Sequence, residues 1–231
     1  QSAKKYTGSS YIAYFQAYTN TYASLAYLEK LYMEAILHPD IRILSIATRP
    51  DCLSTEILDL LERLNQIKPV WVELGLQTIH ERTARYIRRG YDLPVFETAV
   101  SELRRRGIDV IVHTILCLPG ETKPDMLQTI QYLNRQDIQG IKLQLLHILK
   151  DTDLAEIYAS DPFPVPDPQE YYELLGACIS HLRPDIVIHR LTGDGPKELL
   201  TAPLWTCNKR QVLNQLQSYF KTHDIWQGKE Y

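Results

Sequence analysis

Residues 108–122, IDVIVHTILCLPGET, constrain the fold of this chain more than any other stretch. Apolar residues, many of them β-branched, fill most of positions 108–116, and Pro119 ends the run. This pattern predicts a strand that is buried on both faces and ends in a tight turn. A Thr-x-x-Asp signal at residues 122–125 then starts an apolar-periodic helix. A buried strand, a turn and a helix in this order indicate a parallel α/β fold in which this strand is central.

Strand-like runs recur along the chain at the spacing of one βα unit. They begin near residues 11, 41, 70, 108 and 140, and helix-like segments lie between them. Right-handed crossovers of that length lay strands side by side in parallel. Polar residues recur at the carboxyl end of every strand-like run. We therefore expect an α/β fold of the partial (β/α)6 TIM-like barrel type, rather than an open doubly wound sheet.

A proline-rich segment divides the chain. Residues 161–168, DPFPVPDP, carry four of the 13 prolines and predict an extended linker. We expect a barrel core over residues 1–160 and a C-terminal helical extension over residues 161–231 that packs on it. The extension is predicted to contain helices at 169–182 and 208–220, a sixth strand at 185–191 and a packed lid at 192–205.

Charge and cysteine spacing exclude several classes of protein. The net charge of −3 gives no overall electrostatic reason to expect nucleic acid. No apolar run reaches the ~18 residues of a membrane span, and the start QSAKKYTGSS lacks a signal-peptide core. We expect a cytoplasmic protein without a membrane anchor. The four cysteines, at positions 52, 117, 178 and 207, are too dispersed for a metal cluster and should be free thiols.

Polar residues inside strand-like runs are the candidates for a ligand site. Glu73 and Gln77 point to the same face of their strand, which in a barrel is the interior. Buried polar groups there are costly without partners, so either a satisfied polar core network or a polar ligand is expected. Arg89 could pair with a ligand carboxylate, or lie with neighbouring arginines on a solvated helix face. His113, inside the central strand, must also find a partner or a ligand.

Six motifs spread over nearly the whole chain carry a family resemblance. They are, in order, YFQAYTNTY, SIATRPDCL, VWVELGLQT, IRRGYD, HTILCLPGE and GIKLQLLHILKDT. They resemble successive βα motifs of radical S-adenosylmethionine enzymes, in the uncharacterised bacterial group related to the radical domain of the Elongator catalytic subunit. The resemblance implies a [4Fe-4S] cluster that reductively cleaves S-adenosylmethionine to a 5′-deoxyadenosyl radical. It also implies an electron donor such as flavodoxin or ferredoxin, and it suggests a tRNA base as the otherwise unknown substrate.

The resemblance assigns cofactor-binding roles to residues near the start of the chain and in the third strand-like run. The loop formed by Gln16, Ala17, Tyr18 and Thr19 matches the loop whose backbone meets the methionine amino group. Gln77 matches a polar residue near the ribose or methionyl group. We therefore expect both places to contact S-adenosylmethionine.

Further roles fall on the middle of the chain. Arg89 matches the arginine that pairs the methionyl carboxylate. His113 stands where related enzymes often have a ribose-facing polar residue. Leu116, Cys117 and Leu118 belong to the adenine-side loop. We expect these residues to complete the cofactor site.

The chain departs from the family pattern in three places. Ala47 stands where several relatives carry a carboxylate, so we expect Glu73 to take over that role. Cys117 replaces the usual glycine before LPGE, which narrows the space beside the adenine. The CxxxCxxC-type motif that ligates the cluster is absent. We expect its cysteines, with the first family strand, upstream of Gln1, and we expect this chain alone to be inactive.

A second function class remains open. A cluster-free protein on the same barrel could hold a small anion at Arg89 and Gln77. Three cysteines in the cluster spacing upstream of Gln1 would discriminate between the two. Dinucleotide-binding, nucleotide-binding, zinc-protease and hydrolase functions all lack their motifs in this sequence.

Overall fold

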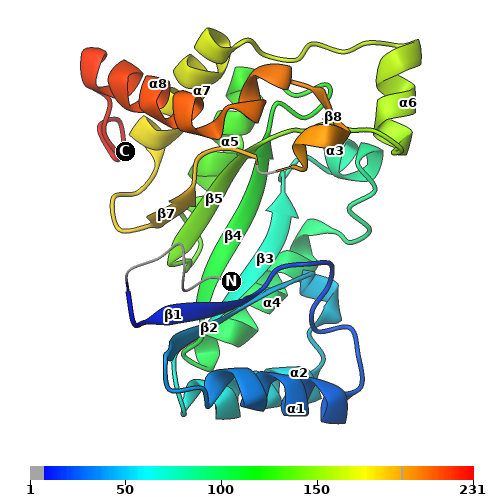
Figure 1. The fold of residues 1–231 in the computed structure, drawn as a ribbon, viewed down its shortest axis with the longest axis vertical. Helices are drawn as coiled ribbons and strands as arrows, with labels where there is room; N and C mark the ends of the chain where they lie inside the picture. The colour runs from blue at the N-terminus through cyan, green and yellow to red at the C-terminus, as the bar shows by residue number, and fades with distance from the viewer. Residues whose placement is uncertain (1–7, 194) are drawn as a thin grey trace. The chain divides into compact units, whose positions relative to one another are not determined.

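The computed structural model describes residues 8–193 and 195–231 (Figure 1). Residues 1–7, in the polar start of the sequence and of the predicted core, and residue 194, in the predicted lid, lie outside the described part. Six strands hydrogen-bond in the order β1-β2-β3-β4-β5-β7. They are β1 (Tyr11–Phe15), β2 (Ile41–Thr48), β3 (Val70–Gln77), β4 (Asp109–Leu116), β5 (Gly140–Leu145) and β7 (Val187–Arg190). The starts predicted for the first five strands are confirmed to within one residue, and β7 begins two residues after the start predicted at 185. Strand β4 lies inside the sheet as predicted.

The chain forms two compact units. The first comprises Gln1–Leu76, Tyr91–Val112 and Asp137–Gly140, and the second comprises Gln77–Gly90, His113–Gln136 and Ile141–Tyr231. The predicted domain boundary at residue 160 falls inside the second unit and stays a prediction. No helix in the described ranges combines the length and the apolar character needed to cross a membrane.

The first unit begins with two parallel strand pairs, β1 with β2 and β2 with β3. Helices α1 (Leu25–Ile36) and α2 (Thr55–Asn65) lie side by side in this unit (Figure 1). Helix α1 buries Leu28, Tyr32 and Ile36, which recur every four residues and so share one face. A short 3-10 helix, η2 (Pro50–Cys52), precedes α2, and α4 (Leu93–Arg105) completes the unit's helices.

Strand β3 shows how the sheet separates its apolar core from its polar face. Val70, Val72, Leu74 and Leu76 are at most 1% exposed, so alternate residues form one fully buried apolar face. Glu73 stands on the opposite face and is also buried, at 4% exposed. The alternation predicted from the sequence therefore holds, with the carboxylate of Glu73 on the face opposite the apolar one.

The second unit combines strands with several helices. It contains α3 (Glu81–Tyr86), α5 (Lys123–Leu133), α6 (Asp153–Ser160), α7 (Pro168–His181) and α8 (Lys209–Thr222). Helix α7 packs against both α5 and α8, and α7 and α8 lie side by side in Figure 1. Tyr171 of α7 is fully buried, and its hydroxyl donates to the Leu191 carbonyl oxygen at 2.7 Å. Helix α7 begins at Pro168, and residues 161–167 are non-helical as their prolines predicted.

The single strand predicted over residues 140–149 is wrong in one respect. Strand β5 ends at Leu145, and Ile148–Leu149 form a separate strand, β6, that pairs antiparallel with β8 (Leu200–Ala202). The Leu146 N–H still donates to the Leu116 carbonyl oxygen at the end of β4, at 3.1 Å, and residues 146–147 then separate β5 from β6. The segment predicted as a lid thus supplies β8, flanked by the 3-10 helices η3 (Lys197–Leu199) and η4 (Leu204–Cys207).

Candidate functional site

The loop after β1 is held by one side chain that the sequence analysis missed. The Asn20 amide nitrogen donates to the carbonyl oxygens of Phe15, at 3.0 Å, and Ala47, at 2.9 Å. The Tyr32 hydroxyl donates to the carbonyl oxygen of Asn20 itself. Residues 16–18 are exposed between these anchors, and Tyr18 has a left-handed backbone with φ 61°. Asn20 therefore fixes both ends of a loop whose predicted role is to offer its backbone to a ligand.

Glu73 has found protein partners. Its carboxylate accepts a hydrogen bond from the Tyr14 hydroxyl at 2.8 Å and another from the Ser45 hydroxyl at 2.7 Å. The parallel register places Tyr14 beside Ser45, and Ala47 beside Glu73. This arrangement matches the polar core network weighed for Glu73, and its role towards a ligand stays a prediction.

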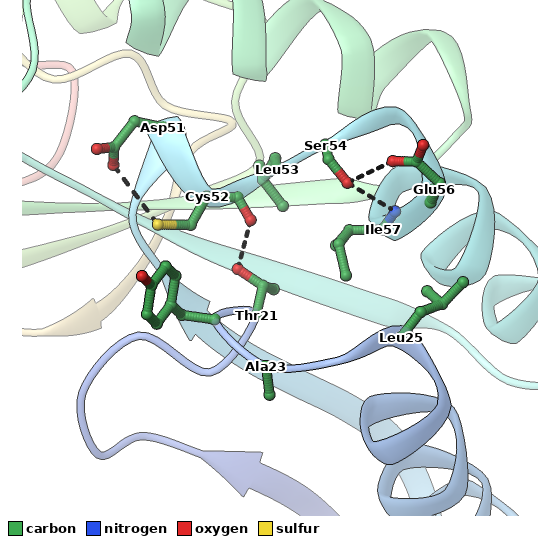
Figure 2. A pocket seen from close by; sticks show the side chains of 10 residues that line it. Thr21, Ala23, Leu25, Asp51, Cys52, Leu53, Ser54, Glu56 and Ile57 are labelled. Atoms are coloured by element: carbon green, nitrogen blue, oxygen red, sulfur yellow. Dashed lines mark hydrogen bonds between the residues drawn. The ribbon is translucent and has the colours of Figure 1, made fainter.

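The first unit also contains a cavity of about 600 Å³ between the loops that follow β1 and β2 (Figure 2). The Thr21 hydroxyl donates to the Cys52 carbonyl oxygen at 2.7 Å, and it lies 2.6 Å from the Thr48 hydroxyl. Because Thr21 has one hydroxyl proton, Thr48 must be the donor in that second contact. Asp51 lines the cavity, and the Arg49 guanidinium holds the pKa of that carboxyl below its usual value.

Gln77, the last residue of β3, carries two unusual features. Its side-chain oxygen Oε1 is buried, and none of the residues that the structure describes donates a hydrogen bond to it. Its backbone is left-handed, with φ 67°, which costs a non-glycine residue roughly 1 kcal/mol or more. A buried acceptor without a donor, on a strained backbone at a strand's carboxyl end, is typical of a ligand-binding position.

Arg89 does not lie on a solvated helix face, because its side chain is only 2% exposed. Its guanidinium donates to the Thr78 carbonyl oxygen at 2.7 Å and to Oε1 of Glu81 at 2.8 Å. The alternative of a solvated arginine is therefore wrong for this residue. Arg89 is a buried cation whose carboxylate partner, Glu81, is itself 35% exposed. A ligand carboxylate at this guanidinium would compete with Glu81.

A second pair of turns is joined by Thr78 and Glu121. The Thr78 hydroxyl donates to Glu121 at 2.5 Å and accepts from the backbone N–H of His80 at 3.1 Å. Burial raises the pKa of the Glu121 carboxyl, although hydrogen bonds from Thr78 and Thr83 act in the other direction. This pair fixes the LPGE turn to the turn after β3. The LPGE turn could be located in the sequence, but its contact with Thr78 could not be predicted from it.

The loop that the resemblance places beside the adenine has a backbone suited to glycine at position 117. Cys117 has a left-handed backbone with φ 64°, and its N–H donates to the Met126 sulfur at 3.1 Å. Burial, followed by the charges of Glu170 and Glu121, raises the pKa of the Cys117 thiol to about 12. Leu118 is 2% exposed. The loop therefore presents a protonated thiol on a backbone that a glycine would adopt without strain.

His113 and the adjoining Thr114 have both found partners, as polar residues in a buried strand must. The Thr114 hydroxyl donates to the Lys142 carbonyl oxygen at 3.2 Å. The side-chain amide of Gln144 lies 3.3 Å from Nδ1 of His113. The structure brings Gln77, Arg89, His113 and the loop 116–118 into the second unit, whereas residues 16–19 and Glu73 belong to the first.

The thiols give a direct test of the electrostatics. Burial raises the pKa of Cys178 to about 12, as at Cys117. At pH 8 the thiolate fraction of these residues is then about three orders of magnitude below that of free cysteine. The higher pKa makes each thiolate more nucleophilic, but by less than two orders of magnitude. We expect iodoacetamide to label both residues at least tenfold more slowly than free cysteine, measured by peptide mass spectrometry. The urea-unfolded chain is the control, and native labelling at the free-cysteine rate would contradict the expectation.

Parallel strands alternating with helices define an α/β protein, a class in which ligands bind at the carboxyl ends of the strands. Residues 2–133 match the model of the radical SAM superfamily, and residues 138–222 match that of the radical SAM C-terminal domain. The chain belongs to the radical SAM superfamily.

Individual relatives agree with that assignment. The uncharacterized protein YtqA of Bacillus subtilis is 39% identical over 226 residues, covering 98% of this chain and 70% of that protein. Elongator complex protein 3 of Schizosaccharomyces pombe is 24% identical over 178 residues, covering 75% of this chain and 32% of that protein. The solved structure of Methanocaldococcus infernus Elp3 with an N-terminal deletion has a TM-score of 0.78 at 16% identity, over 94% of this chain and 55% of that one. This likeness confirms the predicted fold, an α/β partial barrel of parallel strands.

Proposed function

We propose that this chain forms the S-adenosylmethionine-binding core of a radical enzyme. Its membership of the radical SAM superfamily supports S-adenosylmethionine and a [4Fe-4S] cluster as the cofactors of the whole protein. When bound, these two groups supply a 5′-deoxyadenosyl radical, and a donor such as flavodoxin or ferredoxin supplies the electron. The likeness to Elongator complex protein 3 is the support for a tRNA base as substrate.

The observation that carries the proposal is the buried oxygen of Gln77. A buried amide oxygen without a donor costs roughly 1–3 kcal/mol, and the left-handed backbone adds to that cost. A ligand that donates a hydrogen bond to Oε1 would recover the first cost. The ribose hydroxyls and the α-ammonium group of S-adenosylmethionine are donors of this kind. Gln77 therefore fits the polar end of that cofactor.

Arg89 supports the same assignment through its charge. The buried guanidinium offers parallel donors that match the geometry of a carboxylate. We assign the methionyl carboxylate to Arg89. The remaining roles in the proposal go to the backbone of residues 16–19 for the amino group, Glu73 in place of the carboxylate missing at Ala47, His113 for the ribose, and Leu116, Cys117 and Leu118 for the adenine.

The cluster does not fit the residues that the structure describes. Among them, no group of three His, Cys, Asp or Glu side chains could hold a metal ion. The four cysteines are free thiols, and Cys178 is fully buried. No step of the reaction is therefore assigned to a cluster held by these residues.

Replacing Gln77 by alanine tests the carrying observation. In the full-length, cluster-bearing protein, we expect Gln77→Ala to weaken S-adenosylmethionine binding by about 1 kcal/mol, or roughly fivefold, because one neutral hydrogen bond is lost. Isothermal titration measures the change. Gln128→Ala, at an exposed position of α5, is the matched control and should bind as wild type does. Wild-type affinity in Gln77→Ala would remove the main support for the proposed site.

A reconstitution experiment tests the cluster assignment. We expect this 231-residue chain, incubated anaerobically with iron and sulfide, to retain no stoichiometric cluster after desalting. Three converging thiolates are needed to anchor such a cluster. Iron and acid-labile sulfide analysis gives the result, with the full-length protein as the positive control. A stable brown chain with about four irons would show that the cysteines present here suffice.

A further inference from the structure

A groove of about 550 Å³ lies in the second unit, beside the turn that follows β4. The starts of α5 and α7 form two of its sides, and residues 163–166 form a third. Small-molecule sites typically enclose ~300–1,000 Å³, so the groove has room for a compact organic ligand. It also contains two groups whose pKa is raised, Cys117 and Glu121. Perturbed titratable groups in a formed pocket are a mark of binding sites.

The groove has an apolar floor. Leu118, Met126 and Leu174 line it and are 2%, 6% and 7% exposed. Phe163 and Val165 are only partly buried and supply further apolar surface on one wall. A ligand that covers these side chains would remove apolar area from water, at ~25 cal/mol per Å². The apolar part of a ligand is therefore expected to lie on this floor.

Several contacts hold the groove in shape. The ammonium of Lys123 on α5 lies 3.0 Å from Glu173 on α7, which links the two helices. The Trp205 indole N–H donates to the Pro166 carbonyl oxygen at 3.0 Å and so anchors the proline-rich wall. The backbone N–H of Thr122 donates to Asp125 at 2.7 Å, in the capping box of α5. A groove formed before binding spends little free energy on ordering when a ligand arrives.

The electrostatic character of the groove is negative. Its lining contains the carboxylates of Glu121, Glu170 and Glu173 and the single ammonium of Lys123, a formal excess of two negative charges. Two helix N-termini offset roughly half a charge each, which still leaves a negative balance. The pKa of Cys117 is consistent with a negative potential in the groove, because the charges of Glu170 and Glu121 both help to raise it. The groove should therefore favour cations over anions.

We propose that this groove binds a small ligand with an apolar body and one protonated amine. The apolar body lies on Leu118, Met126 and Leu174, and the ammonium group faces Glu170 and Glu173 at the rim. This ligand is additional to S-adenosylmethionine, whose polar groups the proposed function places at Gln77 and Arg89. The groove and the proposed adenine site would share only Cys117 and Leu118. A site of this kind suits an amine-bearing substrate or effector of the enzyme.

The chain contains two methionines, which makes the test direct. With 13C-methyl methionine labelling, Met126 in the groove and Met33 on α1 give two signals, assigned by Met33→Leu. We expect 2-phenylethylamine to shift the Met126 signal through its ring current, with a Kd of about 1 mM, and to leave Met33 unmoved. The anionic isostere 3-phenylpropionate should bind at least threefold more weakly. Equal affinity for the two probes, or no shift at Met126, would overturn the proposal.

Matched variants separate charge from shape. Glu170→Gln keeps an acceptor for the α7 capping box and should weaken the amine about threefold, whereas Glu156→Gln, an exposed carboxylate of α6, should not. Val165→Trp should fill the groove and weaken binding at least tenfold, with Val95→Trp on exposed α4 surface as its control. S-adenosylmethionine should bind together with the amine, so saturating cofactor should leave the Kd of 2-phenylethylamine unchanged. If the cofactor instead displaces the amine, the groove is part of the cofactor site and the proposal of a separate ligand fails.

Discussion

Replacing Arg89 by alanine should weaken S-adenosylmethionine binding by the full-length, cluster-bearing protein by roughly 2–4 kcal/mol, or about 30- to 700-fold. The side chain is 2% exposed, so its charge is poorly screened by solvent. A bidentate charged contact contributes more than the single neutral hydrogen bond proposed for Gln77. Isothermal titration of the two variants should therefore show a clear difference between them.

Arg88→Ala is the matched control for Arg89. Arg88 is the preceding residue, and its guanidinium pairs with Asp153 through side chains that are 74% and 66% exposed. Exposed ion pairs contribute ~0–1 kcal/mol, so its loss should be nearly silent. Glu81→Gln is a further comparison, because it removes the negative charge that competes for Arg89 while leaving an acceptor. This variant should bind S-adenosylmethionine as tightly as wild type or more tightly. If Arg89→Ala binds as Arg88→Ala does, the carboxylate assignment is wrong.

Folding has to be separated from binding in this experiment. Arg89→Ala removes the hydrogen bonds that the guanidinium donates to the Thr78 carbonyl oxygen and to Glu81, which should cost roughly 2–4 kcal/mol of the free energy of unfolding. Arg89→Lys keeps the positive charge and can still reach one acceptor, so this variant should be more stable than Arg89→Ala. It loses the planar fork of donors, and we expect it to bind the cofactor at least tenfold more weakly than wild type.

The strand positions could be predicted from the sequence because they depend on local apolar patterning. Val70, Val72, Leu74 and Leu76 recur at every second position, whereas Glu73 and Gln77 lie on the other face, and this period of two already indicates a strand with one apolar core face. The proline-rich segment was equally readable, because proline excludes helix and central strand wherever it stands. Both signals are contained within a few neighbouring residues.

The elements that were missed depend on distant partners. Strand β6 exists because β8, some fifty residues later, pairs with it, and nothing near Ile148 reveals that partner. Helix α6 spans only Asp153–Ser160 and buries none of its residues. Its local signs are the cap at Thr152, whose hydroxyl accepts from the Ala155 N–H, and an acidic first turn. Two helical turns are too short to establish an apolar period, so the sequence analysis missed this helix.

The candidate site shows the same division. Residue types at strand ends could be read from the sequence, and Gln77 does carry the buried acceptor expected of a ligand position. The partners could not be read. The guanidinium of Arg89 already pairs with Glu81, and the side chain of Asn20 fixes the loop after β1. Both contacts depend on side-chain directions that are set by the folded chain. A sequence pattern therefore located polar groups without showing which are already satisfied by protein.

Gly193→Ala should destabilise the chain by roughly 1–3 kcal/mol, the second largest effect expected of a single change. A Cβ at this position would lie 2.6 Å from ring atoms Cε1 and Nε2 of His147. The ring cannot turn aside cheaply, because its Nδ1 accepts a hydrogen bond from the Gly195 N–H at 3.3 Å. Urea unfolding measures the loss. Gly8→Ala is the control, since a Cβ there meets no atom within 4 Å and should change stability little.

A double-mutant cycle distinguishes this close contact from a general effect on the backbone. If the imidazole ring is the obstacle, His147→Ala makes room for the new methyl group, and the double variant should be more stable than the sum of the two single losses predicts. We expect a coupling energy of roughly 1 kcal/mol or more, as found for residues in direct contact. Additive losses would mean that Gly193 matters for its backbone alone. A coupled result would instead show that the ring of His147, which lies between β5 and β6, packs directly against Gly193. That contact would hold in place the segment that leads into β8.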